Sequence, residues 1–188
     1  MSVRSLPSLG FASLLLALPA AALRAQSVAA LPHDSIHADG EFVRHAAADN
    51  LLEVQLGQLA ERRASNPMVQ KFGEKMALDH EKLEEQWTDL AAKHGLTFKP
   101  VLSSSQQGKL TRLQQASRTA FDREYMLAMI KGHTKDVADL KAAVDSARSE
   151  PVRKMAAYAL PIVQEHLQNA RVAGKEVGLD STAVAERP

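Results

Sequence analysis

The chain of 188 residues contains no cysteine. This absence excludes disulfide bridges, thiol nucleophiles, thiolate zinc sites, iron–sulfur clusters and a lipoprotein anchor. Any metal ion that the protein binds must therefore be held by histidine, carboxylate or methionine side chains.

Residues that favour β-strands are also scarce. Aromatic residues make up 4% of the chain, and there are only 13 valines and 3 isoleucines against 31 alanines and 24 leucines. Alanine and leucine favour helices, whereas β-branched and aromatic residues favour strands. Since 45% of the residues are hydrophobic, the chain can bury a full core. We expect a folded, all-α protein.

The apolar run near the N-terminus, Leu9–Leu18, is too short to span a bilayer. Arg4 precedes this run and the small residues Ala20–Ala22 follow it, which is typical of a secretory signal peptide. We predict that residues 1–22 are removed, with a second acceptable cleavage after Ala25, and that no stable membrane anchor remains. Export without lipidation favours a periplasmic location, with secretion beyond the periplasm as the alternative.

The chain carries little net charge, with 23 basic and 22 acidic residues. Loss of residues 1–22 removes Arg4 and no acid, so the mature chain has 22 of each and a net charge of 0. This balance gives no electrostatic basis for binding nucleic acid, and we expect no nucleic-acid partner.

The hydrophobic pattern predicts four long amphipathic helices between residues 39 and 177. Capping residues or prolines mark their expected starts at Asp39-Gly40, Asn66-Pro67, Ser117 or Thr119, and Ser149-Glu150-Pro151. Ser103 and Gln106 predict a capping box for a short extra helix between the second and third long helices. We take residues 23–38 as a flexible N-terminal tail and residues 178–188 as a C-terminal tail. This order of elements is typical of a four-helix bundle.

Each long helix carries one residue able to ligate a metal on its expected inward face. These residues are Glu53, His80, His133 and His166. The inward face of the first helix is expected to comprise Phe42, Ala46, Asp49, Glu53, Leu56 and Ala60.

The heights of these four residues along their helices can be compared. His133 and His166 lie equally far from the turn that joins their helices, whereas Glu53 and His80 differ by about one helical turn. If the two hairpins are in register, a carboxylate and three imidazoles converge near the middle of the bundle. Such a set suits one metal ion, namely Zn, Fe, Mn or Cu.

A second interpretation needs no ligand. Any single histidine is more often a core residue that a neighbour such as Asp79, Asp136 or Tyr125 satisfies. Three buried imidazoles and a carboxylate at one level are costly, however, unless they pair or bind something. For the set we favour a bound ligand, with Asp79 and Asp136 as partners that orient the rings.

Several short motifs follow one another along residues 40–173. They are Glu53-Val54, Leu56-Gly57-Gln58-Leu59-Ala60, Ala64-Ser65-Asn66-Pro67, Phe72 with Met76, Asp79-His80, Phe121-Asp122 with Tyr125, His133, and Leu160-Pro161 with His166-Leu167. In this order and spacing they resemble the bacterial "domain of unknown function 4142" family of exported proteins. The resemblance implies a ferritin-like four-helix bundle but no established reaction.

The sequence departs from the ferritin-like di-metal pattern, in which two helices each supply a Glu-x-x-His motif. Three residues before His80 stands Ala77, and three before His166 stands Val163. Both of the expected glutamates are therefore absent, and the residues fit one metal ion better than two.

Three functions remain open at this point. The first is an exported protein that binds a metal ion or small ligand in its core and serves metal homeostasis or envelope stress protection. An enzymatic version, with oxidase or catalase-like activity, also needs an open coordination position. The alternative is a non-catalytic structural or interaction protein whose polar core layer fixes the register of the helices. Whether the chain is an enzyme and whether it forms a homodimer are left undecided by the sequence.

Overall fold

The computed structural model describes residues 34–180, and this part of the chain contains six helices and no strand. The helices are α1 (Asp34–Ala38), α2 (Gly40–Arg63), α3 (Pro67–Lys93), α4 (Ser104–Gln115), α5 (Arg118–Ser146) and α6 (Glu150–Glu176). The prediction of an all-α protein is confirmed. The predicted signal peptide and most of both predicted tails lie outside the described residues.

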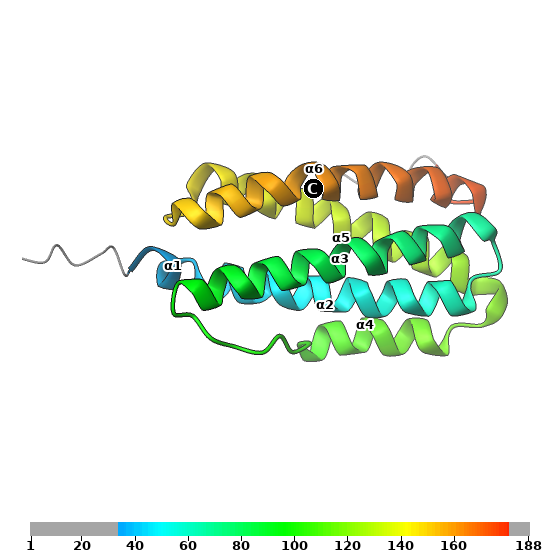
Figure 1. Cartoon of the computed structure of the whole chain (residues 1–188). Coiled ribbons are helices and arrows are strands. Elements are labelled where there is room, and N and C mark those ends of the chain that lie inside the picture. The colour runs from blue at the N-terminus through cyan, green and yellow to red at the C-terminus, as the bar shows by residue number, and fades with distance from the viewer. Residues whose placement is uncertain (1–33, 181–188) are drawn as a thin grey trace, which may run out of the picture. The chain divides into compact units, whose positions relative to one another are not determined.

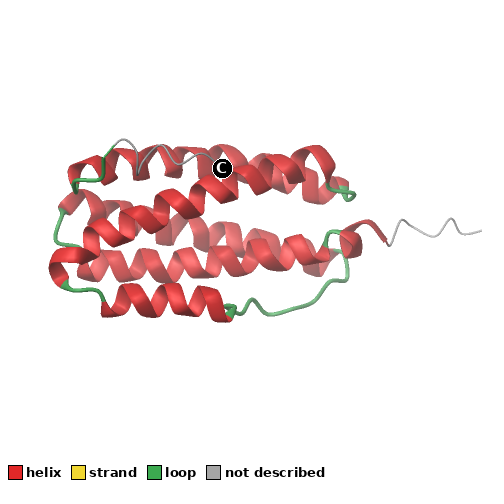
Figure 2. Cartoon of the chain, turned by 180° about the vertical axis from the view of Figure 1, so that it is seen from behind, coloured by secondary structure: helices red, strands yellow, loops and turns green. Residues whose placement is uncertain are grey.

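The four long helices form two hairpins, α2 with α3 and α5 with α6 (Figure 1). The hairpins meet where α3 contacts α6 and α2 contacts α5. The short helix α4 lies alongside α2, and an extended connection leads to it from the end of α3, as Figure 2 shows from behind. The expected short helix between the second and third long helices is therefore present.

Local hydrogen bonds explain where three of the helices begin. The side chain of Asn66 accepts from the backbone N–H of Met68, and Pro67 follows as the first helical residue of α3. Ser103 and Gln106 form the predicted capping box of α4. Ser117 accepts from the backbone N–H of Ala120 at the start of α5.

Two aspartates connect the hairpins end to end. The carboxylate of Asp39, just before α2, accepts from the backbone N–H groups of residues 148–149 in the turn between α5 and α6, at 3.1 and 2.6 Å. Asp122, near the start of α5, accepts from the N–H groups of residues 65–66 in the turn between α2 and α3, at 3.1 and 2.8 Å. Asp39 was expected to cap its own helix and makes no such hydrogen bond. Each hairpin turn is instead capped by an aspartate from the other hairpin.

The buried apolar side chains form two separate clusters. The larger members are Phe72, Met76, Phe121 and Tyr125 in the first cluster, and Leu83, Trp87, Leu140 and Val152 in the second. On α3, Met76 belongs to the first cluster, Leu83 belongs to the second, and buried His80 lies between them. On each of the other long helices, a buried polar residue likewise lies between members of the two clusters. A layer of buried polar residues therefore divides the core.

Both ends of the described residues extend slightly into the predicted tails. Ile36, in α1, is 3% exposed and belongs to the second apolar cluster, and Leu179 is 4% exposed and belongs to the first. A single apolar residue produces no periodic pattern, which is why the sequence did not predict either contact.

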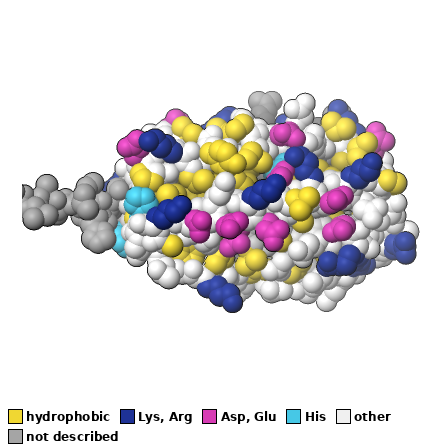
Figure 3. Space-filling model, viewed as in Figure 1, with side chains coloured by type: hydrophobic (Ala, Val, Ile, Leu, Met, Phe, Trp, Pro, Cys, Tyr) yellow, Lys and Arg dark blue, Asp and Glu magenta, His cyan; other side chains and the backbone are white. Residues whose placement is uncertain are grey.

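No helix of the described residues is long and apolar enough to cross a membrane. On the face shown in Figure 3, basic and acidic side chains are interspersed among apolar ones. This face therefore carries both signs of charge.

Helices α2 and α3 pack closely against each other at two glycines. A Cβ atom on Gly57 would lie 2.6 Å from the carbonyl oxygen of Gly73, and one on Gly73 would lie 2.7 Å from the Cβ of Ala60. Real side chains do not tolerate contacts this short, so the backbones can come this close only because both positions lack a side chain.

We predict that Gly57→Ala lowers the free energy of unfolding by about 1–3 kcal/mol, because the methyl group must push the two helices apart. Urea unfolding followed by circular dichroism would measure the change. Gly108→Ala in α4 is the matched control, since nothing lies within 4 Å of its added methyl group. Alanine there should leave stability unchanged or raise it by up to about 1 kcal/mol. Equal effects at both positions would contradict the packing argument.

Candidate metal centre

The four residues predicted to converge are all buried and come from four different helices. Glu53 is 6% exposed, His80 is 3% exposed, and His133 and His166 are 0% exposed. The three imidazole rings form a triangle, with centroids separated by 5.1 Å for His80 and His166, 5.5 Å for His80 and His133, and 5.7 Å for His133 and His166. The structure therefore brings the three histidines together at one level of the core.

His133 is held by its own helix. Its Nδ1 lies 2.9 Å from the carbonyl oxygen of Met129, one turn earlier in α5. A carbonyl only accepts hydrogen bonds, so Nδ1 must carry the proton and donate it. The other nitrogen, Nε2, keeps a lone pair, and it is buried with no hydrogen-bond partner.

His80 is oriented by Asn50 of the neighbouring helix α2. The side-chain Nδ2 of Asn50 donates to the carbonyl oxygen of Ala46 at 2.6 Å, so its Oδ1 faces the ring. His80 Nδ1 lies 2.8 Å from this oxygen and donates to it. The lone pair of the neutral ring is then on Nε2.

His166 is oriented by Asp79, which comes from the other hairpin. Its Nε2 lies 3.0 Å from Oδ2 of Asp79, and Lys75 donates to the same oxygen at 2.8 Å. Burial favours the neutral form of Asp79, but the hydrogen bonds from Lys75 and His166 outweigh it and lower the pKa of this carboxyl. The ionised carboxylate only accepts, so Nε2 donates and Nδ1 of the neutral ring keeps a lone pair.

All three rings thus donate outward, and each retains one lone pair. His166 Nδ1 and His80 Nε2, both with lone pairs in the neutral rings, are 3.2 Å apart. One ring nitrogen from each histidine lies within 4.8 Å of those of the other two. Three atoms at such separations all lie within about 2.8 Å of a common point, and tetrahedral bonds of about 2.0–2.1 Å from a metal would place its nitrogens about 3.3 Å apart. The geometry fits a metal ion with little rearrangement.

Burial keeps the three rings neutral. It lowers the pKa of His80 well below the ordinary value, lowers that of His133 to about 3, and also lowers that of His166. The neighbouring rings add to the effect at His80 and His133, whereas the hydrogen bond to Asp79 opposes it at His166. At neutral pH all three lone pairs are available to a metal ion.

Glu53 belongs to a different group of potential ligands from the one that the sequence suggested. It lies with His133 and Asp136, each offering one ligand atom within 4.8 Å of those of the others. Its Oε2 is buried without a hydrogen-bond partner. The predicted set of four therefore resolves into two groups, three histidines in one and Glu53 in the other, and His133 is common to both.

The carboxyl groups of this second group resist ionisation. Burial is the main reason that the pKa of Glu53 lies well above its ordinary value, and nearby Asp136 and Asp49 raise it further. Burial together with Asp49 raises the pKa of Asp136 to about 7. A cation beside these groups would offset both effects.

The predicted ring-orienting residues differ from the observed ones at two positions, Asn50 and Asp136. Asn50 was not predicted, because the buried face in the first half of α2 contains Val43, Ala47 and Asn50 rather than residues one position earlier. Asp136 was expected to orient a histidine, and no hydrogen bond joins it to one among the described residues. The only sign in the sequence that Asn50 belongs to the site is its position one helical turn before Glu53.

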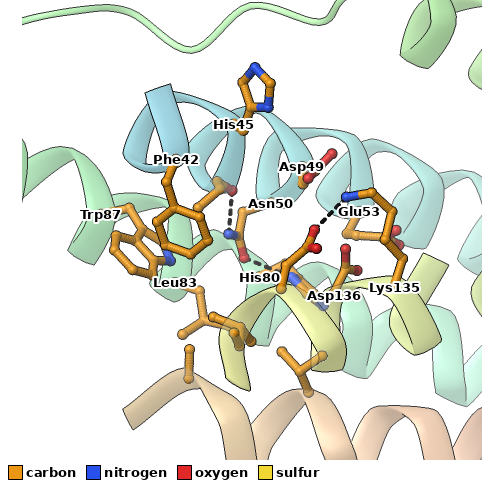
Figure 4. A pocket seen from close by; sticks show the side chains of 15 residues that line it. Phe42, His45, Asp49, Asn50, Glu53, His80, Leu83, Trp87, Lys135 and Asp136 are labelled. Atoms are coloured by element: carbon orange, nitrogen blue, oxygen red, sulfur yellow. Dashed lines mark hydrogen bonds and ion pairs between the residues drawn. The ribbon is translucent and has the colours of Figure 1, made fainter. Parts of the chain in front are cut away.

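A cavity of about 110 Å³ reaches this region from the surface between α2 and α5. Figure 4 shows Phe42, Leu83 and Trp87 on one side of it and Glu53, Lys135 and Asp136 on the other, with Asn50 bonded to His80 between them. His80, Glu53 and Asp136 are thus accessible from the cavity. His133 and His166 do not line it.

Comparison with known proteins gives a family but no relative of known activity. The family described as "Domain of unknown function (DUF4142)" matches residues 22–172. No curated protein and no solved structure matches the chain.

The outward hydrogen bonds predict a specific tautomer for each ring. In metal-free protein at pH 7, His80 and His133 should carry the proton on Nδ1 and His166 should carry it on Nε2. Long-range ¹H–¹⁵N correlation spectra of histidine-labelled protein distinguish these forms. A doubly protonated His166 at pH 7 would contradict the assignment.

Asp136 should make the metal-free protein less stable as the pH rises. The unfolded state ionises this group near its ordinary value of about 3.9, whereas the folded state does so near 7. Its favourable contribution is therefore complete below about pH 4 and is lost as the pH rises through 7. Between pH 4.5 and 8.5, wild type should lose about 1–2 kcal/mol relative to Asp136→Asn, since the group is only partly buried and solvent screens the effect.

Urea unfolding of both proteins across this pH range would measure the difference. The three histidines are present in both proteins, so the difference reports Asp136 together with its effect on the pKa of Glu53. Parallel stability curves would show that the carboxyl group titrates normally.

Proposed function

The chain belongs to the domain of unknown function 4142 family, and we propose that it binds one metal ion through His80, His133 and His166. The observation that carries this proposal is the set of outward hydrogen bonds, which leaves one lone pair on each of three buried rings that lie together. Partners that fix the ring tautomers in this way are typical of metal-binding histidines.

A hydrogen-bonded polar layer accounts for these contacts less well. The 3.2 Å contact between His80 and His166 becomes a hydrogen bond only if one of the two rings carries a second proton, and burial lowers the pKa of both rings. Even then Nε2 of His133 has no partner. A metal ion would satisfy all three nitrogens at once.

The donor set narrows the identity of the ion. Of Zn, Fe, Mn and Cu, manganese prefers oxygen ligands, and non-haem iron is typically held by two histidines and a carboxylate. Three neutral imidazoles suit zinc and copper better. Three protein ligands with an open fourth position are common for zinc. We therefore propose Zn²⁺ first and copper second.

We further propose that the four long helices are a ferritin-like four-helix bundle adapted to a single ion. Two hairpins packed side by side support this interpretation. Ala77 and Val163 stand where a di-metal site would need glutamates. A role in metal homeostasis or envelope stress protection follows from one ion per chain together with the signal peptide expected at residues 1–22, which would direct the protein to the periplasm.

The test is metal analysis of protein purified without a histidine tag. We expect one ion per chain, and at a free Zn²⁺ concentration of 100 times Kd the free energy of unfolding should rise by about 2.7 kcal/mol. His166→Ala should raise Kd by at least about 100-fold, because it removes one of three ligands.

His94→Ala is the matched control, since His94 is exposed at the end of α3. It should leave Kd unchanged. If wild type holds no stoichiometric metal and is not stabilised by zinc or copper, the proposal is wrong and the polar layer is structural.

A further inference from the structure

We propose that Glu53, Asp136 and His133 form an outer cation site that the metal ion occupies on its way to the three histidines. This inference rests on the metal binding proposed above and adds the route by which the ion arrives. The two positions would be occupied in turn.

The sharing of His133 makes the two sites mutually exclusive. Both groups of potential ligands contain this residue. Its Nδ1 is engaged by the carbonyl of Met129, so only Nε2 can coordinate, and one lone pair serves one ion. An ion at the outer site would therefore keep His133 as a ligand as it moves inward. It would exchange Glu53 and Asp136 for His80 and His166.

The cavity places the carboxyl groups on the path from solvent. Glu53 and Asp136 line it together with His80, whereas His133 and His166 are fully buried and do not. An ion that enters from this side meets the carboxyl groups and His80 before it can reach the other two rings.

The acidic side chains along the cavity favour a cation, because a bound cation offsets the effects that raise the pKa of Glu53 and Asp136. Four of its lining residues are acidic, namely Asp49, Glu53, Asp136 and Asp139. The one lysine among them, Lys135, forms an ion pair with Asp139 at 2.5 Å. Acidic side chains in a cleft with apolar walls raise the local concentration of cations.

The other approach to Glu53 has the opposite charge. Oε1 of Glu53 lies 3.5 Å from the place that a Cβ atom on Gly132 would occupy, and Gly132 lines a groove between α4 and α5. The groove is also lined by Lys109, Arg112, Lys131 and Lys135, with Glu124 as its acid. This basic groove disfavours a cation, which leaves the acidic cavity as the route.

The unpartnered oxygen of Glu53 is the second, independent sign of a ligand. Oε2 is buried without a hydrogen-bond partner, as is Nε2 of His133 in the same group. A buried polar atom without a partner is costly. A cation bound by both atoms would remove that cost. Acidic groups on a solvated surface have no such cost, because water satisfies them.

The experiment is stopped-flow measurement of Co²⁺ binding and release, followed by the visible absorption of the bound ion. Substitution of a residue that lies on the route but does not ligate the final ion should lower the association rate and the dissociation rate by the same factor. We expect Glu53→Gln and Asp136→Asn each to lower the association and dissociation rates by about tenfold or more, with Kd changed by less than about fivefold and one ion bound per chain.

Asp145→Asn is the matched control, because Asp145 is an exposed acid on the same helix as Asp136 and does not line the cavity. It should leave both rates unchanged. Thermal unfolding of the metal-free variants verifies that each is folded.

A second background isolates the outer site itself. His166→Ala breaks the inner site, so its residual Co²⁺ binding should depend on the outer ligands. Adding Asp136→Asn should abolish this residual binding, although the same substitution barely changes Kd in wild type.

Each other result is informative. Unchanged rates, or two ions bound per chain, would overturn the outer site. A large rise in Kd for Glu53→Gln with an unchanged association rate would make Glu53 a ligand of the final ion, which overturns the route but keeps the metal. Failure of wild type to bind Co²⁺ or Zn²⁺ would instead overturn the proposed function.

Discussion

The reciprocal capping by Asp39 and Asp122 is the constraint on which the site depends. Each carboxylate accepts hydrogen bonds from backbone N–H groups in the turn of the other hairpin, one at each end of the molecule described by residues 34–180. Together they fix how far one hairpin slides along the other. Since His80 comes from one hairpin and His133 and His166 from the other, a shift of one helical turn, about 5.4 Å, would separate the rings.

Hydrogen bonds on the outer side of the rings stabilise the buried polar layer. Asn50 and Asp79 receive ring N–H groups from His80 and His166, and Asn50 is itself anchored to the backbone of α2. These bonds hold the rings in one orientation without using the nitrogens that face the middle. The apolar clusters on both sides surround the rings of His133 and His166, which are fully buried, and this low-dielectric setting strengthens their electrostatic interactions.

The sequence predicts those features whose signals are local. Asn66 and Ser117 start helices through hydrogen bonds that span two or three residues, and the helical period identified the inward histidines. The rotation of α2 about its axis is not local: packing buries Val43 rather than the residue before it and brings Asn50 to His80. The grouping of Glu53 with residues of α5 likewise depends on contact between hairpins, which no periodic pattern encodes.

If the three histidines bind metal as proposed, the single free lone pair of His133 would limit each chain to one ion. With Nδ1 engaged by its own helix, the ring cannot bridge two ions, so a richer supply of metal would not increase the load of a chain. A cell that relied on this protein to buffer metal would have to adjust the number of copies, since each chain would act as a one-ion carrier and not as a store.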